Sequence, residues 1–135
     1  MAKSNKIAQK FHIIMCEDVR RELGNKMSLM GVYSGEVILK KLPGTMRSLV
    51  FVLMLENILT PFKKLAVSLK MPKDKLVELI LDAPENIELN TNANLAVGFS
   101  PVIMQNSGDA RVEFRFGDDK KPRIVYRFKI SEARK

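Results

Sequence analysis

The sequence is poor in the residues that build catalytic centres, metal sites and disulfide frameworks. Its 135 residues include one cysteine, Cys16, one histidine, His12, and no tryptophan. A single cysteine forms no internal disulfide, and a single histidine excludes every metal site that uses two of them, zinc fingers included. The seven glycines are scattered rather than gathered in a phosphate-binding loop, and no serine lies in a nucleophile elbow. We therefore expect no catalytic residue, no metal site and no cofactor, and the protein is not predicted to be an enzyme.

The side chains that could still carry chemistry have unsuitable spacing. His12 and Cys16 are four residues apart, which on a strand places them on one face but about 13 Å from each other. That separation is too large for a nucleophile and its base. The adjacent carboxylates at 17–18 and 118–119 lack the ligand spacing of a calcium loop. We expect a structural histidine, a buried thiol and two solvated turns.

Long hydrophobic runs are also missing. The longest, Leu49–Leu55, has seven residues, whereas a membrane-spanning helix needs about 20. Residues 1–10 are polar, contain three lysines and lead into no signal-peptide core. These features predict a cytoplasmic protein, or a subunit of a virion or other assembly built in the cytoplasm, with no membrane partner.

Length and composition predict one domain over residues 1–135, with residues 1–6 flexible. The chain is 46% hydrophobic and 28% charged, which is ordinary for a globular protein of this size. A chain of this length buries roughly two-thirds of its unfolded surface, so a core forms without covalent staples.

Alternation of apolar and polar residues is the dominant pattern in the sequence. In the segment 111–116, for example, Val112, Phe114 and Phe116 alternate with charged residues. Such alternation is typical of half-buried strands. It recurs over residues 7–15, 62–71, 93–104 and 123–130, and Gly, Pro or Asn turns delimit further strands at 19–23, 26–33 and 36–42. About eight short strands predict an all-β fold, an antiparallel β-sandwich, with a partly open barrel as the alternative.

Three segments need separate interpretation. Residues 49–55 are apolar on both parities, which fits either a strand buried on both sides or about one and a half helical turns, and the shortness and Val/Phe content of the run favour the strand. Residues 75–81 fit either a strand or a short helix capped by Asp74, and their β-rich surroundings favour the strand. Pro101 interrupts the segment 93–104 and indicates an edge strand or a bulge.

Positive charge is concentrated at the two ends of the chain. The net charge is +8, from 23 basic and 15 acidic residues. Residues 110–135 hold nine basic and four acidic side chains, and the predicted C-terminal hairpin gathers most of this excess on one face. This candidate basic face consists of Arg111, Arg115, Arg123, Arg127 and Lys129.

The basic face has two interpretations. It is either a contact surface for phosphates or an acidic partner, or a solvated sheet face that keeps the protein soluble. The aromatic residues of the hairpin alternate onto the opposite face. This weakens the case for single-stranded nucleic acid, whose bases stack on exposed aromatic rings.

One motif resembles a known family. It comprises a Cys-x-Asp-Val-Arg sequence at residues 16–20, a Gly-Asn turn at 24–25 and a Ser-Leu-x-Gly-Val-Tyr sequence at 28–33. Over residues 11–40 the chain resembles a family of short bacterial and phage-associated proteins of unknown function. The resemblance implies a small β-sandwich and transfers no catalytic residue.

Together these observations predict a non-enzymatic protein-interaction module, a structural or accessory subunit of a homo-oligomer or larger complex. A phage-related subunit is the version that the resemblance implies. The expected partner is another protein or a second copy, and no small-molecule substrate is expected. The alternative is sequence-indifferent nucleic-acid binding through the basic face.

Overall fold

The computed structural model describes residues 6–24, 26–84 and 87–134. These residues form strands and no helix, so none of them belongs to a helix long and apolar enough to cross a membrane. The strands that they form are β1 (Ala8–Glu22), β2 (Lys26–Val32), β3 (Glu36–Leu39), β4 (Gly44–Met46), β5 (Leu49–Ile58), β6 (Lys64–Met71), β7 (Lys75–Asp82), β8 (Ala93–Phe99), β9 (Val102–Met104), β10 (Gly108–Phe116) and β11 (Ile124–Glu132).

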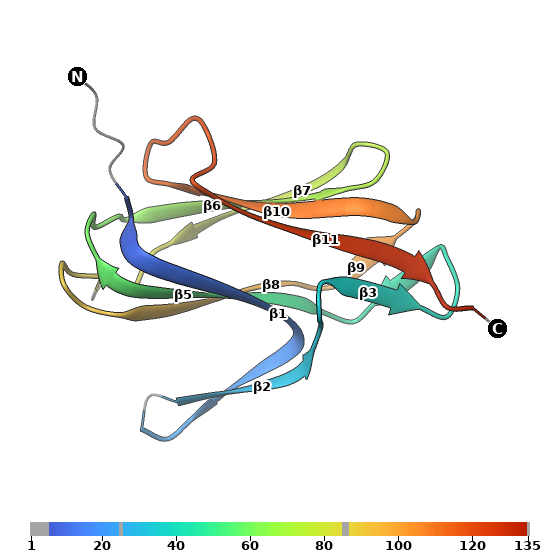
Figure 1. The fold of residues 1–135 in the computed structure, drawn as a ribbon, viewed down its shortest axis with the longest axis horizontal. Helices are drawn as coiled ribbons and strands as arrows, with labels where there is room; N and C mark the ends of the chain where they lie inside the picture. Colours follow the sequence, from blue (N-terminus) through green and yellow to red (C-terminus); the bar gives the residue numbers. More distant parts are fainter. Residues whose placement is uncertain (1–5, 25, 85–86, 135) are drawn as a thin grey trace.

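Two sheets form the layers of a β-sandwich (Figure 1). The first has the strand order β2-β1-β5-β8 and is curled like half of a barrel, and the second has the order β3-β11-β10-β6-β7. The short strands β4 and β9 make a small third sheet. Every pairing is antiparallel except that of β3 with β11. The predicted all-β sandwich is therefore confirmed, and the curl of the first sheet adds the character of a partly open barrel.

The main core lies between the two sheets and explains the alternation of the sequence. Strand β10 turns Val112, Phe114 and Phe116 inward, and all three are buried. The ring of Phe51, from β5, is fully buried at the centre of the core. It contacts aromatic rings from both layers, with centroids 6.1 Å from Phe99 and 5.8 Å from Phe128. Aromatic contacts of this kind add to the area burial that holds the layers together.

Strand β5 is buried on both faces, as its two-sided apolar sequence predicted. One face, which includes Phe51 and Leu53, belongs to the main core. Val50 and Val52 point the other way and form a second, smaller cluster with Cys16. Partly buried side chains of β1 and β2, among them Val19 and Leu29, pack against this cluster. The curl of the first sheet thus folds an arm, made of residues 17–24 and 26–32, over the back of β5.

Strand β1 corrects one expectation. The sequence predicted two strands, 7–15 and 19–23, separated by a turn at Glu17 and Asp18, but β1 runs unbroken through both segments. The chain changes partner instead of turning, since β1 pairs with β5 up to Cys16 and with β2 from Cys16 to Glu22. The turn predicted at 24–25 includes Asn25, which lies outside the described residues.

Other boundaries are refined by the structure. Residues 75–82 form a strand, which settles the strand-or-helix ambiguity. The segment 93–104 divides into β8 and β9 at Ser100 and Pro101, where the proline has no amide hydrogen to continue the ladder. Strand β3 ends at Leu39 rather than Leu42. The C-terminal hairpin pairs as predicted, with Phe114 opposite Ile124 and Ala110 opposite Phe128.

Candidate functional site

The two side chains suited to nucleophilic or acid–base chemistry lie in different environments. Cys16 is fully buried in the small cluster, and its Sγ donates a hydrogen bond to the carbonyl of Asp18 at 3.5 Å. Burial raises the pKa of this thiol, which keeps it protonated and unreactive. His12 is exposed and lies 3.6 Å from Glu56. No group of three His, Cys, Asp or Glu side chains that could hold a metal ion occurs within the described ranges.

The adjacent carboxylates are engaged in local structure. An oxygen of Asp18 accepts a hydrogen bond from the amide of Val19 at 2.8 Å. Asp119 accepts hydrogen bonds from both the Nε and the Nη2 of Arg123, at 2.7 and 3.0 Å, and another from the amide of Phe116. Asp119 therefore closes the β10–β11 turn and fixes the direction of Arg123.

The candidate basic face is only partly free. Arg111 donates to Glu113 at 2.6 Å, Arg115 donates to Glu78 of β7 at 2.7 Å, and Arg123 is held by Asp119. Lys70 of β6 reaches the same Glu113 at 3.1 Å. Three of the five residues named from the sequence thus have an acidic partner on the same surface.

Glu113 is the centre of this charge network. Burial alone would raise its pKa, but hydrogen bonds from Arg111 and Lys70 and their positive charges outweigh burial, so the pKa of Glu113 lies below its usual value. Arg127 and Lys129 are exposed, and no ion pair involves them within the described residues. Arg127 lies opposite Arg111 in the ladder. Because Arg111 is paired with Glu113 and Arg127 has no such ion pair among the described residues, the free charge of this face is concentrated on β11.

Strand β7 forms one edge of the second sheet. It pairs with β6, and among the described residues no strand pairs with its other edge. Leu76 and Ile80 share the outer face of the sheet with the charge network and are 56% and 68% exposed. Val77, on the inner face, is also exposed because the opposing sheet does not cover it fully. An eight-residue strand with a free backbone edge and exposed apolar side chains is a template for pairing with another chain.

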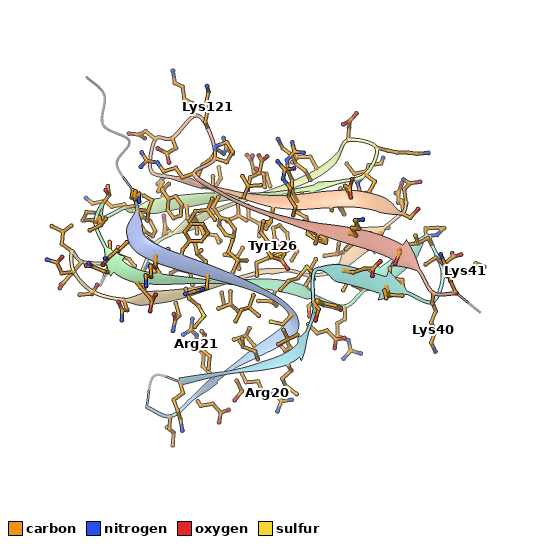
Figure 2. The ribbon with its side chains drawn as sticks, in the orientation of Figure 1. Arg20, Arg21, Lys40, Lys41, Lys121 and Tyr126 are labelled. Atoms are coloured by element: carbon orange, nitrogen blue, oxygen red, sulfur yellow. The ribbon has the colours of Figure 1, made fainter. Side chains whose placement is uncertain are left out.

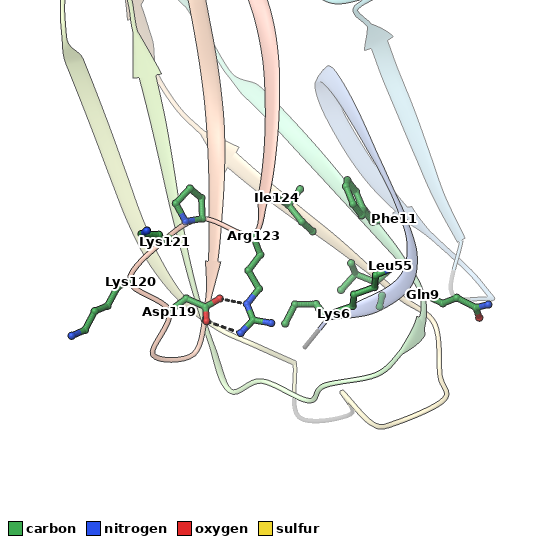
Figure 3. A pocket seen from close by; sticks show the side chains of 12 residues that line it. Lys6, Gln9, Phe11, Leu55, Asp119, Lys120, Lys121, Arg123 and Ile124 are labelled. Atoms are coloured by element: carbon green, nitrogen blue, oxygen red, sulfur yellow. Dashed lines mark hydrogen bonds and ion pairs between the residues drawn. The ribbon is translucent and has the colours of Figure 1, made fainter. Parts of the chain in front are cut away.

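A groove lies at one end of the sandwich, where β1 begins (Figure 3). It has a volume of about 760 Å³, and its walls are residues 6–11 and residues 119–124. Leu55 and Ile124 contribute buried apolar surface, and Phe11 stands in the wall with 48% of its surface exposed. A neighbouring cavity of about 690 Å³ shares Arg123 with the groove and extends past Phe62.

Neither the β7 edge nor the groove was predicted from the sequence. The β7 edge has a signal there, since residues 75–81 are apolar at nearly every position, but an exposed edge and a buried strand look alike until the strand order is known. The groove has no local signal, because its walls are more than 100 residues apart in the sequence. Comparisons with protein-family models, with curated proteins and with solved structures found no significant match.

Proposed function

We propose that this chain is a non-enzymatic protein-interaction module and that it works as a subunit of a homo-oligomer or of a larger complex. The proposal places it in the cytoplasm or in an assembly built there. A phage-related accessory subunit is one version of the proposal, and that version depends on the motif at residues 16–33 alone.

The observation that carries the proposal is the free edge of β7. Backbone amides and carbonyls on such an edge gain partners when another strand is added, and the apolar side chains beside them lose contact with water. Proteins that remain monomeric commonly protect an edge with prolines, bulges or inward-pointing charges. The outer face of β7 instead presents Leu76 and Ile80 on either side of Glu78.

A second copy of the chain fits this edge. Antiparallel pairing across a two-fold axis at Glu78 would place Leu76 of each copy opposite Ile80 of the other. The same symmetry brings the two Glu78 carboxylates together, which would be repulsive if each were alone. Each is already neutralised by Arg115 at 2.7 Å within its own chain. The interface is therefore apolar with compensated charge, and it is isologous, as in most homodimers.

Light scattering after size exclusion, at about 0.1 M and about 0.5 M salt, tests the proposal. We expect a defined oligomer at both salt concentrations, because apolar contacts and backbone pairing are not screened by ions. Ile80→Lys should give a monomer. Val125→Lys is the matched control, because Val125 is an exposed apolar residue of the same sheet but lies on β11, three strands from β7. A wild-type protein that is monomeric at about 100 µM, or equal effects of the two variants, would contradict the proposal.

Nucleic-acid binding is the second candidate, supported by the free charges of Arg127 and Lys129. Binding through phosphates should weaken steeply with salt, because each contact releases counterions. The ion pairs predict which arginine matters more for nucleic-acid binding. Arg127→Glu should weaken binding more than Arg115→Glu, because the guanidinium of Arg115 is already held by Glu78. A monomer that carries material absorbing at 260 nm in low salt and loses it in high salt would favour this candidate over the β7 edge.

A further inference from the structure

The two strands beside the groove each have a stretch of free edge. Strand β1 pairs with β2 only from Cys16 onward, and β11 pairs with β3 only from Lys129 onward. Within the described residues, the second edges of Ala8–Ile14 and Ile124–Phe128 therefore have no strand partner. We call the boundary between these two edges the seam, and the groove lies at the end of the seam where β1 begins (Figure 3).

Side chains that face the core are incompletely covered along the seam. Phe11 and Ile13 point to the core side of β1, since they lie opposite Leu55 and Leu53 of β5. Phe11 is nevertheless half exposed and Ile13 is only partly buried. Tyr126 on β11 is also partly buried, and Figure 2 shows it between the ribbons of β1 and β11. Ile13 and Tyr126 still pack against the main core, so Phe11 is the side chain of these three that the two layers leave half uncovered.

The groove end of the seam carries positive charge. Four cationic side chains, Lys6, Lys120, Lys121 and Arg123, line it together with a single carboxylate, Asp119, which leaves three positive charges in excess. Lys120 and Lys121 stand on the turn and point outward, whereas Asp119 keeps the Arg123 guanidinium beside the groove (Figure 3). The field at this end favours an anionic occupant.

We infer that the seam binds an extended segment of a partner protein, with apolar residues at alternate positions and acidic residues at the end next to the 117–123 turn. A polypeptide strand supplies the repeated backbone donors and acceptors that two free edges require, and alternate side chains reach the exposed core face. The acidic end matches the excess positive charge. This inference rests on the proposed function as an interaction module, but it does not depend on the β7 edge.

Fluorescence anisotropy with labelled peptides tests the inference. The probe is an eight-residue peptide of alternating Val and Thr with three Asp residues at one end. One comparison peptide carries three Lys residues instead, and another carries Pro at two central positions and so cannot pair as a strand. We expect the acidic peptide to bind with a micromolar Kd and the other two to bind at least tenfold more weakly.

Protein variants locate the binding. Replacing Lys120 and Lys121 together by Glu should weaken binding of the acidic peptide about tenfold at 0.1 M salt, and less at 0.5 M. The matched control replaces Lys40 and Lys41 by Glu, because this exposed lysine pair lies at the opposite end of the molecule (Figure 2). The control should change the Kd by less than twofold. Phe11→Asp should remove binding while the circular dichroism spectrum stays that of a β-sandwich.

Several results would overturn the inference. They are equal binding of the acidic and lysine peptides, equal binding of the proline peptide, and no binding at about 100 µM. Binding that appears only after residues 1–5 are deleted would mean that the chain's own N-terminal residues occupy the seam. Ile80→Lys should leave peptide binding unchanged, so failure of the seam and failure of the β7 edge can be told apart.

Discussion

Replacing Val52 by alanine tests whether the arm formed by residues 17–24 and 26–32 is packed against β5. Val52 is completely buried in the small cluster, on the face of β5 that turns away from the main core. The substitution removes apolar surface equivalent to about two methylene groups, at about 0.8 kcal/mol each, and leaves a cavity that costs more. We expect the free energy of unfolding to fall by about 2–3 kcal/mol.

Val125→Ala is the control for this experiment. Val125 is also a strand valine, but it is 38% exposed on the outer face of the second sheet. Both substitutions remove the same two methyl groups from a strand valine, so a larger loss for Val52 reports its deeper burial. Urea unfolding should be followed by far-ultraviolet circular dichroism, because the chain has no tryptophan. If the two variants lost equal stability, the small cluster would contribute no packing energy and the arm would be only loosely attached.

Three further predictions follow from side-chain environments. Glu113→Gln should lower the free energy of unfolding by about 1–2 kcal/mol near pH 7. The pKa of Glu113 is lowered in the folded state, so this contribution is present above about pH 4 and is lost as the pH falls through the folded pKa. Urea titrations of the wild type and the variant should therefore converge in acid. Gly44→Ala should lower the free energy of unfolding by about 1–3 kcal/mol in the same assay, because the new Cβ would lie 2.6 Å from the carbonyl oxygen of Lys41. Gly98→Ala is the control and should be tolerated, because the nearest atom to its Cβ would lie at 3.6 Å. The thiol of Cys16 should react with an aromatic disulfide reagent only after urea unfolds the protein, since it is fully buried and its pKa is raised; rapid reaction of the native protein would contradict this.

Most strands were predictable because their signal is local. In β10 and β11, alternation alone identified the buried aromatic residues, and the polar turn between them fixed the hairpin. Strand β5 was predictable for a related reason: apolar side chains on both parities require two buried faces. The sequence did not, however, indicate that the second face is covered by the chain's own arm.

The missed features depend on long-range geometry. At Glu17 and Asp18 the polar pair looked like a turn, but the strand continues because β1 exchanges β5 for β2 as its partner. The ion pair between Arg115 and Glu78 joins residues 37 positions apart and depends on β7 lying two strands from β10. The spacing of charges along one hairpin therefore overstated how much of the basic face is free.

The position of β10 and β11 bears on how the chain is made. Both lie inside the five-stranded sheet, between β3 and β6, although they follow β3, β6 and β7 in the chain. Until they leave the ribosome, β3 has no sheet to join and the β6–β7 hairpin has no neighbour on its β6 side. Exposed apolar strands of this kind are the segments most prone to aggregate during folding. Strands β10 and β11 thus complete the second layer, and a chain interrupted before residue 108 would lack the side chains with which they cover the apolar face of the first layer.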